Sequence, residues 1–249
     1  MNNLNSIQGK TALVLGGSRG IGAAVARRLA AGGASVAITY VQGAEAAKAV
    51  VDDIGKAGGR AIAIQADSAN EAAIENAVAQ TKEAFGSFDI LVNNAGVLAV
   101  APIEEFTTED LDRTLAVNVR AAVIASRAAA RVMGQGGRII HIGSTNAERM
   151  PFAGGAVYAM SKSALQGLTQ GLARDLGPKG ITVNVVQPGP VDTDMNPANG
   201  PKAEFLLPLI ATGRYGRPEE VASFVAYLAG PEAAYISGAS LMIDGGFAA

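Results

Sequence analysis

The chain has 249 residues, of which 49% are hydrophobic and 17% are charged, and its formal net charge is −2. This length suits one large domain or two small ones, and the absence of cysteine excludes disulfides, zinc–thiolate sites and thiol nucleophiles. With no cluster of Lys and Arg, no run of about 18 apolar residues and no signal-peptide pattern, we expect a soluble cytoplasmic protein that binds neither nucleic acid nor membrane.

Short apolar runs alternate with helical stretches along the first half of the chain. Because buried parallel strands appear as short apolar runs, these runs predict strands, and the longer stretches between them predict helices. The expected elements are strands at 11–15, 36–40, 61–65 and 90–92, and helices at 23–31, 44–57 and 70–85. The first strand runs into a glycine-rich turn, 16–22, and the fourth into Asn93-Asn94-Ala95-Gly96.

The second half continues the same alternation. The expected elements are strands at 138–142, 182–186 and 240–243, and helices at 109–133, 155–176 and 218–230. The stretch 188–213 is rich in Pro, Gly and Asn, and has no clear period. Such a long irregular connection is typical of a lid or binding loop, so we interpret it as the substrate loop.

No linker or change of composition interrupts the alternation, so residues 1–249 are expected to form a single domain. Alternating strands and helices favour right-handed βαβ units with one parallel sheet. The predicted fold class is α/β, a Rossmann-type doubly wound parallel sheet of seven strands with helices on both faces. Folds of this kind place their chemistry at the carboxyl ends of the strands.

The first strand–turn–helix carries glycines at 16, 20 and 22. Glycine permits a tight turn and lets a pyrophosphate approach the backbone at the N-terminus of a helix. The spacing is not that of the G-x-G-x-x-G fingerprint, and no Gly-Lys-Ser or Gly-Lys-Thr follows as in a P-loop. An ordinary turn is therefore the alternative to a nucleotide site.

The end of the second strand indicates which dinucleotide is bound. NAD enzymes usually carry an acid there for the ribose 2′-hydroxyl, whereas this chain has Tyr40 and no acid between 34 and 44. Arg19 within the glycine turn favours a 2′-phosphate, and hence NADP(H), unless it is only a solvated surface residue. Asp67, after the third strand, is interpreted either as an acceptor for the adenine amino group or as a helix N-cap.

A tyrosine and a lysine four residues apart, Tyr158 and Lys162, fall on one side of a predicted helix. Ser144 follows the strand 138–142. A free tyrosine has a pKa of about 10, and the Lys162 ammonium, with an oxidised nicotinamide nearby, would lower that pKa. We therefore expect Tyr158 to exchange a proton with a substrate oxygen that Ser144 holds. Singly, these residues could also be a helix aromatic and a loop cap.

Other polar residues are interpreted as structural. His141 is the single histidine, and it lies within a predicted strand. Asp192 and Asp194 have no histidine or third carboxylate nearby in the sequence, so loop capping is favoured and no metal site is predicted. Asp244, next to two glycines, is expected to form a terminal turn.

Taken in order, these motifs resemble the short-chain dehydrogenase/reductase family from about Lys10 to the C-terminus. The resemblance implies a catalytic set of Asn118, Ser144, Tyr158 and Lys162. It also implies the use of NADP(H), a small-molecule carbonyl or alcohol as substrate, and a homotetramer. The cofactor-binding residues it implies are Gly16, Ser18, Arg19, Gly20, Ile21, Gly22, Tyr40, Asp67, Ser68, Asn94, Ala95, Gly96, Tyr158, Lys162, Pro188, Gly189, Val191 and Thr193.

Within the family the chain resembles the 3-oxoacyl-carrier-protein-reductase-like branch. The stretches 143–151 and 184–190 are similar to a smaller group that includes biofilm-dispersal proteins described as binding cyclic di-GMP. The functions considered are thus an NADPH-dependent carbonyl reductase, a 3-oxoacyl thioester reductase and a cyclic-di-GMP-binding regulator.

Two departures from the family pattern stand out. Leu15 occupies the position of a usual hydroxyl residue, so the hydrogen bond that pins the Asn93-Asn94 turn must be absent or replaced. Ser144 lies one residue further from Tyr158 than usual, so the loop between them must differ in shape. We expect this loop and an apolar pocket to set substrate choice; the pocket candidates are Met150, Phe152, Met195, Phe205, Leu206 and Leu209. The apolar C-terminus, 245–249, is expected to dock on a neighbouring subunit.

Overall fold

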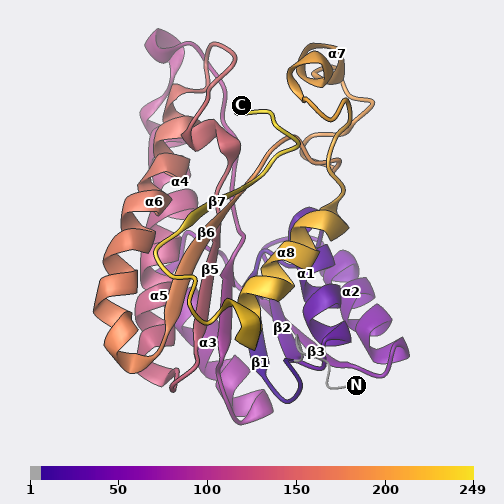
Figure 1. Cartoon of the computed structure of the whole chain (residues 1–249), viewed down its shortest axis with the longest axis vertical. Coiled ribbons are helices and arrows are strands. Elements are labelled where there is room, and N and C mark those ends of the chain that lie inside the picture. The colour runs from indigo at the N-terminus through magenta and orange to yellow at the C-terminus, as the bar shows by residue number, and fades with distance from the viewer. Residues whose placement is uncertain (1–6) are drawn as a thin grey trace.

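A computed structural model of the protein describes residues 7–249 (Figure 1). The segment 1–6, where the sequence lacks a signal-peptide pattern, lies outside the described residues. The strands are β1 (Thr11–Leu15), β2 (Ser35–Tyr40), β3 (Arg60–Gln65), β4 (Ile90–Asn93), β5 (Arg138–Ile142), β6 (Thr182–Pro188) and β7 (Ser240–Ile243). The α-helices are α1 (Gly20–Ala31), α2 (Ala44–Lys56), α3 (Glu71–Phe85), α4 (Thr108–Leu115), α5 (Ala121–Val132), α6 (Ala156–Leu176), α7 (Ala203–Leu206) and α8 (Pro218–Ala229).

The sheet has seven parallel strands in the order β3-β2-β1-β4-β5-β6-β7. The chain winds outward in one direction from β1 to β3 and in the other from β4 to β7, so β1 and β4 flank the topological switch point. Ligands of doubly wound folds bind beyond the carboxyl ends of the strands at this point. The predicted fold class is confirmed.

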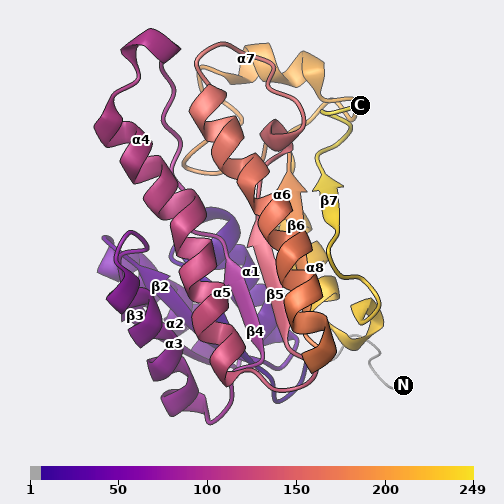
Figure 2. The ribbon, with the colours of Figure 1, turned by 90° about the vertical axis from the view of Figure 1, so that its left-hand side faces the viewer.

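Alternate residues of each strand face two separate cores. In β1, Ala12 and Val14 pack with α1, α2 and α8, whereas Leu13 and Leu15 pack with α3, α5 and the end of α6. Figures 1 and 2 show these two helix layers on opposite faces of the sheet. Strands buried on both faces need apolar residues at nearly every position, which is why the short apolar runs predicted them.

The long helix expected at 109–133 is interrupted. The helix α4 runs into a single π turn, Ala116–Arg120, in which the Ala121 amide donates to the carbonyl of Ala116 five residues earlier; α5 then continues the helix. Such turns are rare in proteins, and those that do occur are often found at functional sites. The stretch 188–213 is also more ordered than expected, since it contains α7. In residues 7–249, no helix is long and apolar enough to cross a membrane.

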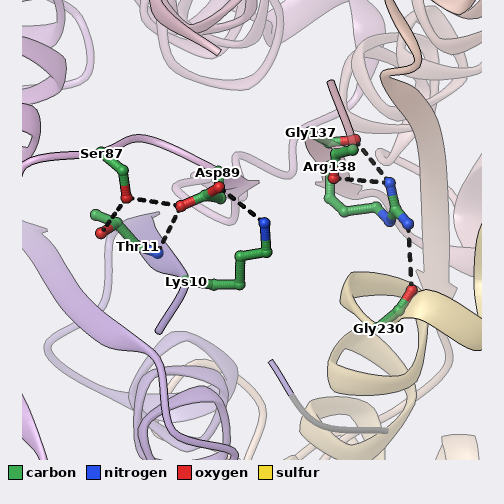
Figure 3. Close-up of polar contacts among 8 residues, drawn as sticks. Lys10, Thr11, Ser87, Asp89, Gly137, Arg138 and Gly230 are labelled. Carbon is green, nitrogen blue, oxygen red and sulfur yellow. Dashed lines mark hydrogen bonds and ion pairs between the residues drawn. The ribbon is translucent and has the colours of Figure 1, made fainter. Parts of the chain in front are cut away.

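Hydrogen bonds and an ion pair link the amino ends of several strands, away from the predicted site (Figure 3). The Asp89 carboxylate accepts hydrogen bonds from the Thr11 amide (2.9 Å), the Ser87 hydroxyl (2.8 Å) and the Lys10 ammonium (3.1 Å). The buried Arg138 guanidinium donates to the carbonyls of Gly136, Gly137 and Gly230, which ties β5 to the end of α8. These contacts stabilise the amino ends of the strands, whereas the predicted active-site residues lie at the carboxyl ends.

Candidate active site

The glycine turn joins β1 to α1 at the switch point. Gly20 has a φ of 52°, a conformation that disfavours side chains. A Cβ added to Gly22 would lie 2.2 Å from the Gly16 carbonyl oxygen, so α1 can approach the strand only with glycine at this position. No side chain caps α1, and among residues 7–249 the amides of Gly20, Ile21 and Gly22 have no acceptor. Such free amides at a helix N-terminus suit an anion.

Two side chains bond the backbone at the start of the glycine turn, where Leu15 itself has no hydroxyl. The Asn94 amide donates to the carbonyl oxygens of Leu15 (3.2 Å) and Gly16 (2.8 Å), which pins the turn after β4 directly to the glycine turn. On the other side, the Gly16 amide donates to the Thr39 hydroxyl at 2.9 Å. Sequence reasoning missed Thr39, although a threonine near the end of a strand next to β1 was an available signal.

The residues predicted to select the cofactor lie along the same edge. Arg19 is exposed at the N-cap of α1 and makes no ion pair with any residue in 7–249, and Tyr40 ends β2. Asp67 lies just beyond β3, where its carboxylate accepts from the Ala69 amide at 2.9 Å. The interpretation of Asp67 as the N-cap of α3 is wrong, because the Asn70 side chain caps that helix. The buried Ser68 follows Asp67 at this edge.

The side chains of Lys162 and Asn118 lie near each other beyond the carboxyl ends of β4 and β5. Lys162 is 4% exposed, and its ammonium donates to the Ile142 carbonyl at 3.0 Å. Asn118, in the π turn, bonds the amide and the carbonyl of Val97 and donates to the Ser161 hydroxyl at 3.0 Å. A Cβ added to Gly96 would lie 3.3 Å from the Lys162 nitrogen and 3.5 Å from the Asn118 oxygen. The turn after β4 thus passes directly over both side chains.

Tyr158 and Ser144 face each other across the site. Burial raises the pKa of Tyr158, and a hydrogen bond with Ser144 opposes that rise. The Lys162 nitrogen lies 5.8 Å from the Tyr158 ring centroid, so the lowering of this pKa by Lys162 and a bound oxidised nicotinamide stays a prediction. The Ser144 amide donates to the Gln187 side chain at 2.6 Å, and its hydroxyl accepts from the Asn146 amide. Gln187, fully buried in β6, was not predicted.

Burial has opposite consequences for the charges of Lys162 and His141. It lowers the pKa of Lys162 to about 8, so the side chain remains mostly charged at neutral pH. Burial, with the Lys162 charge as a second cause, lowers the pKa of His141 to about 4, so this imidazole is neutral. Its Nδ1 lies 2.9 Å from the Asn93 amide nitrogen on the neighbouring strand. His141 is buried in the sheet, in agreement with its structural interpretation.

The segment after β6 lies against the glycine turn. The methyl group of Thr193 would be 3.4 Å from a Cβ added to Gly20, and Val191 is buried beside it. Pro188 ends β6, and Gly189 packs so closely against Asp244 that a Cβ would lie 2.7 Å from the Asp244 Cα. The Asp192 carboxylate accepts from the Ala198 amide, as expected of a loop cap. Residues 7–249 contain no cluster of three or more metal-ligating side chains.

Comparison with known proteins gives matches over nearly the whole chain. A family model described as enoyl-(acyl carrier protein) reductase matches residues 16–248. A solved short-chain dehydrogenase/reductase from Serratia marcescens is 64% identical with a TM-score of 0.96, and the match covers 98% of this chain and 99% of that one. A short chain dehydrogenase from Burkholderia cenocepacia in complex with NADP is 58% identical, with a TM-score of 0.96 and the same coverage.

A third relative is the cyclic-di-GMP-binding biofilm dispersal mediator protein of Escherichia coli strain K12. It is 51% identical over 246 residues, which are 99% of this chain and 100% of that one. This similarity agrees with the smaller group indicated by the stretches 143–151 and 184–190. By its family model, its relatives and its sheet topology, the chain belongs to the short-chain dehydrogenase/reductase family.

Proposed function

We propose that the protein is an NADP(H)-dependent oxidoreductase that reduces a carbonyl group on a small molecule. The observation that carries this proposal is the convergence of Tyr158, Ser144, Lys162 and Asn118 beside the glycine turn at the switch point. A tyrosine bonded to a serine and backed by a buried lysine is suited to giving a proton to a substrate oxygen.

The chain's own residues suit a dinucleotide with a 2′-phosphate. The free amides at the start of α1 would hold the pyrophosphate, and the exposed Arg19 would pair with the 2′-phosphate where no acid follows Tyr40. The edge residues Asp67 and Ser68 would contact the adenosine half. Thr193 and the backbone near Val191 would hold the nicotinamide half. When bound, NADPH supplies the hydride, and close relatives have been solved in complex with NADP or NADPH.

Each catalytic side chain has one role. Tyr158 donates its phenolic proton to the substrate oxygen as charge develops there, and Ser144 donates a hydrogen bond to the same oxygen. Lys162, still charged at neutral pH, stabilises the phenolate that remains. Asn118 fixes the turn at Val97 and, through Ser161, the helix that carries Tyr158. The same groups run the reverse oxidation of an alcohol.

Replacing one hydroxyl group tests this function. The Tyr158→Phe variant should lose at least about 10²-fold in kcat, because general acid catalysis typically contributes 10²–10⁴-fold. The assay follows NADPH oxidation with simple ketones, diketones and 3-oxoacyl thioesters, and the matched control is Tyr235→Phe at a fully exposed tyrosine. Unchanged turnover in the Tyr158 variant would exclude the proposed acid, and equal wild-type turnover with NADH would exclude the preference for NADP(H).

The Escherichia coli relative supports a second candidate, a regulator that binds cyclic di-GMP on the same scaffold. Calorimetry with cyclic di-GMP, with and without NADPH, separates the two functions. Heat of binding that survives Tyr158→Phe, in a protein without ketone turnover, would favour the regulator. Absence of binding at tens of micromolar would leave carbonyl reduction as the function.

The homotetramer and the cytoplasmic location belong to the same proposal. The exposed face of α6 carries the small residues Ala156, Ala164, Gly167 and Gly171, which permit close packing between subunits, whereas the small residues of α5 are mostly buried within the chain. Light scattering should therefore give a mass four times that of the chain, and a monomer would contradict the proposed assembly.

A further inference from the structure

The last residues of the chain form a closed turn within the protein. The Asp244 carboxylate accepts hydrogen bonds from the amides of Gly246 (3.0 Å) and Ala248 (2.9 Å), as predicted for a terminal turn. The Gly245 carbonyl accepts from the Thr212 amide at 3.0 Å. Phe247 is only 2% exposed. The expectation that this apolar terminus docks on a neighbour is therefore wrong for Phe247, whose ring is already buried in its own chain.

Phe247 joins two loops that border the candidate active site. Its ring packs in a small core with residues that follow β6, namely Ala203, Leu206, Ile210 and Tyr215. From the other side, Arg149 donates a 2.6 Å hydrogen bond to the Phe247 carbonyl oxygen. The guanidinium carbon of Arg149 also lies 5.8 Å from the centroid of the Phe247 ring, within the range of a cation–π contact.

Arg149 belongs to the loop between the two catalytic hydroxyls. Its amide donates to the Thr145 carbonyl at 3.0 Å, which closes the short turn that begins directly after Ser144. The half-buried side chain reaches Phe247 from this turn. One short path of contacts thus connects Ser144, Arg149 and Phe247 to the segment 203–215. Figures 1 and 2 show the C-terminus at the same end of the molecule as α7, which belongs to that segment.

We propose that Arg149 and Phe247 are positioning residues that lock the loop 145–156 onto the segment 203–215, and thereby shape the substrate side of the active site. This inference rests on the proposed carbonyl reduction. Neither side chain acts as an acid, base or hydride donor. The guanidinium suits this position because one planar group can donate to the carbonyl and also approach the aromatic ring, which an ammonium does less well.

Three variants test the lock. Arg149→Ala removes both contacts, Arg149→Lys keeps the charge, and Phe247→Leu keeps an apolar side chain in the small core. The matched control is Arg60→Ala, which removes a cation–π pair with Phe85 (5.3 Å) at the amino edge of β3. For Arg149→Ala we expect about a tenfold loss of kcat/KM with bulky ketones, mostly in KM, because misplaced binding groups weaken productive binding. Arg149→Lys should restore part of the loss, and the affinity for NADPH should stay within about twofold of wild type.

Amide hydrogen exchange supplies a readout that does not need turnover. In Arg149→Ala, exchange should accelerate together in 145–156 and in 203–215, and it should remain at the wild-type rate in both segments of Arg60→Ala. Unchanged exchange in either segment of folded Arg149→Ala and Phe247→Leu would overturn the lock. If the wild-type protein reduces no carbonyl but exchange accelerates in both segments, the proposed function fails while the lock stands. If KM rises equally in the Arg60 control, the substrate effect is not specific to the lock.

Discussion

Thr39 supports the glycine turn from the neighbouring strand, and the substitution Thr39→Val tests that support. Valine keeps the branched shape but removes the hydroxyl that accepts the Gly16 amide at 2.9 Å. Thr39 is 1% exposed, so little water can replace the lost acceptor. A buried amide left without a partner costs about 1–3 kcal/mol. For a chain of this size, each kcal/mol lowers Tm by roughly 2–4 °C.

The same substitution should weaken cofactor binding, because the turn is no longer held in its binding conformation. If about 1.4 kcal/mol of the loss is expressed in binding, the Kd for NADPH rises tenfold. Urea unfolding with and without NADPH measures stability, and fluorescence titration measures Kd. The matched control is Thr81→Val in α3, where the fully buried hydroxyl donates to the Ala77 carbonyl and its loss orphans no amide. A Thr39→Val protein with wild-type stability and Kd would refute the reasoning.

Three further predictions concern charged groups. Arg19→Ala should raise the KM for NADPH at least about tenfold with little change for NADH, because a lost charge-assisted phosphate contact costs about 1.5–3 kcal/mol. Steady-state kinetics with both cofactors checks this. Lys162→Met should be inactive yet more stable at pH 7 in urea. Because burial lowers the folded-state pKa of Lys162 to about 8, below its ordinary 10.5, wild-type stability should rise relative to the variant between these two pH values. Asp89→Asn should cost about 1–2 kcal/mol at pH 7. Burial raises the pKa of Asp89, but the hydrogen bonds from Thr11, Ser87 and Lys10 outweigh burial, so the pKa lies below its ordinary 3.8. The stability advantage of the wild type should therefore be lost as the pH falls below 3.8.

The regular elements were predictable because their signals are local. A short apolar run such as 138–142 is typical of a strand that is buried on both faces, and the spacing of Tyr158 and Lys162 places them on one side of α6. The glycine turn was equally readable, because close packing of α1 permits no side chain at Gly22.

Features that depend on distant parts of the chain were not predictable. The π turn has no periodicity signal of its own in the sequence. The side chain of Asn118 within it is held by Val97 and Ser161, which come from other parts of the chain. Gln187 was missed because a buried glutamine in β6 is recognisable only once the Ser144 amide lies beside it. The burial that raises the pKa of Tyr158 was not predictable either, because burial is a property of the folded chain.

The π turn at Ala116–Arg120 also has a genetic consequence. A turn closed from residue 121 to residue 116 holds one residue more than an α-helical turn. Deleting a single codon there would let α4 and α5 merge into one regular α-helix. The residues before and after the deletion would still face the same sides of the protein. The hydrogen-bonding pattern that presents Asn118 would disappear with that residue. The proposed catalytic chemistry would therefore be lost through one in-frame deletion while the dinucleotide fold is kept, which is a short mutational route from an enzyme to a binding protein.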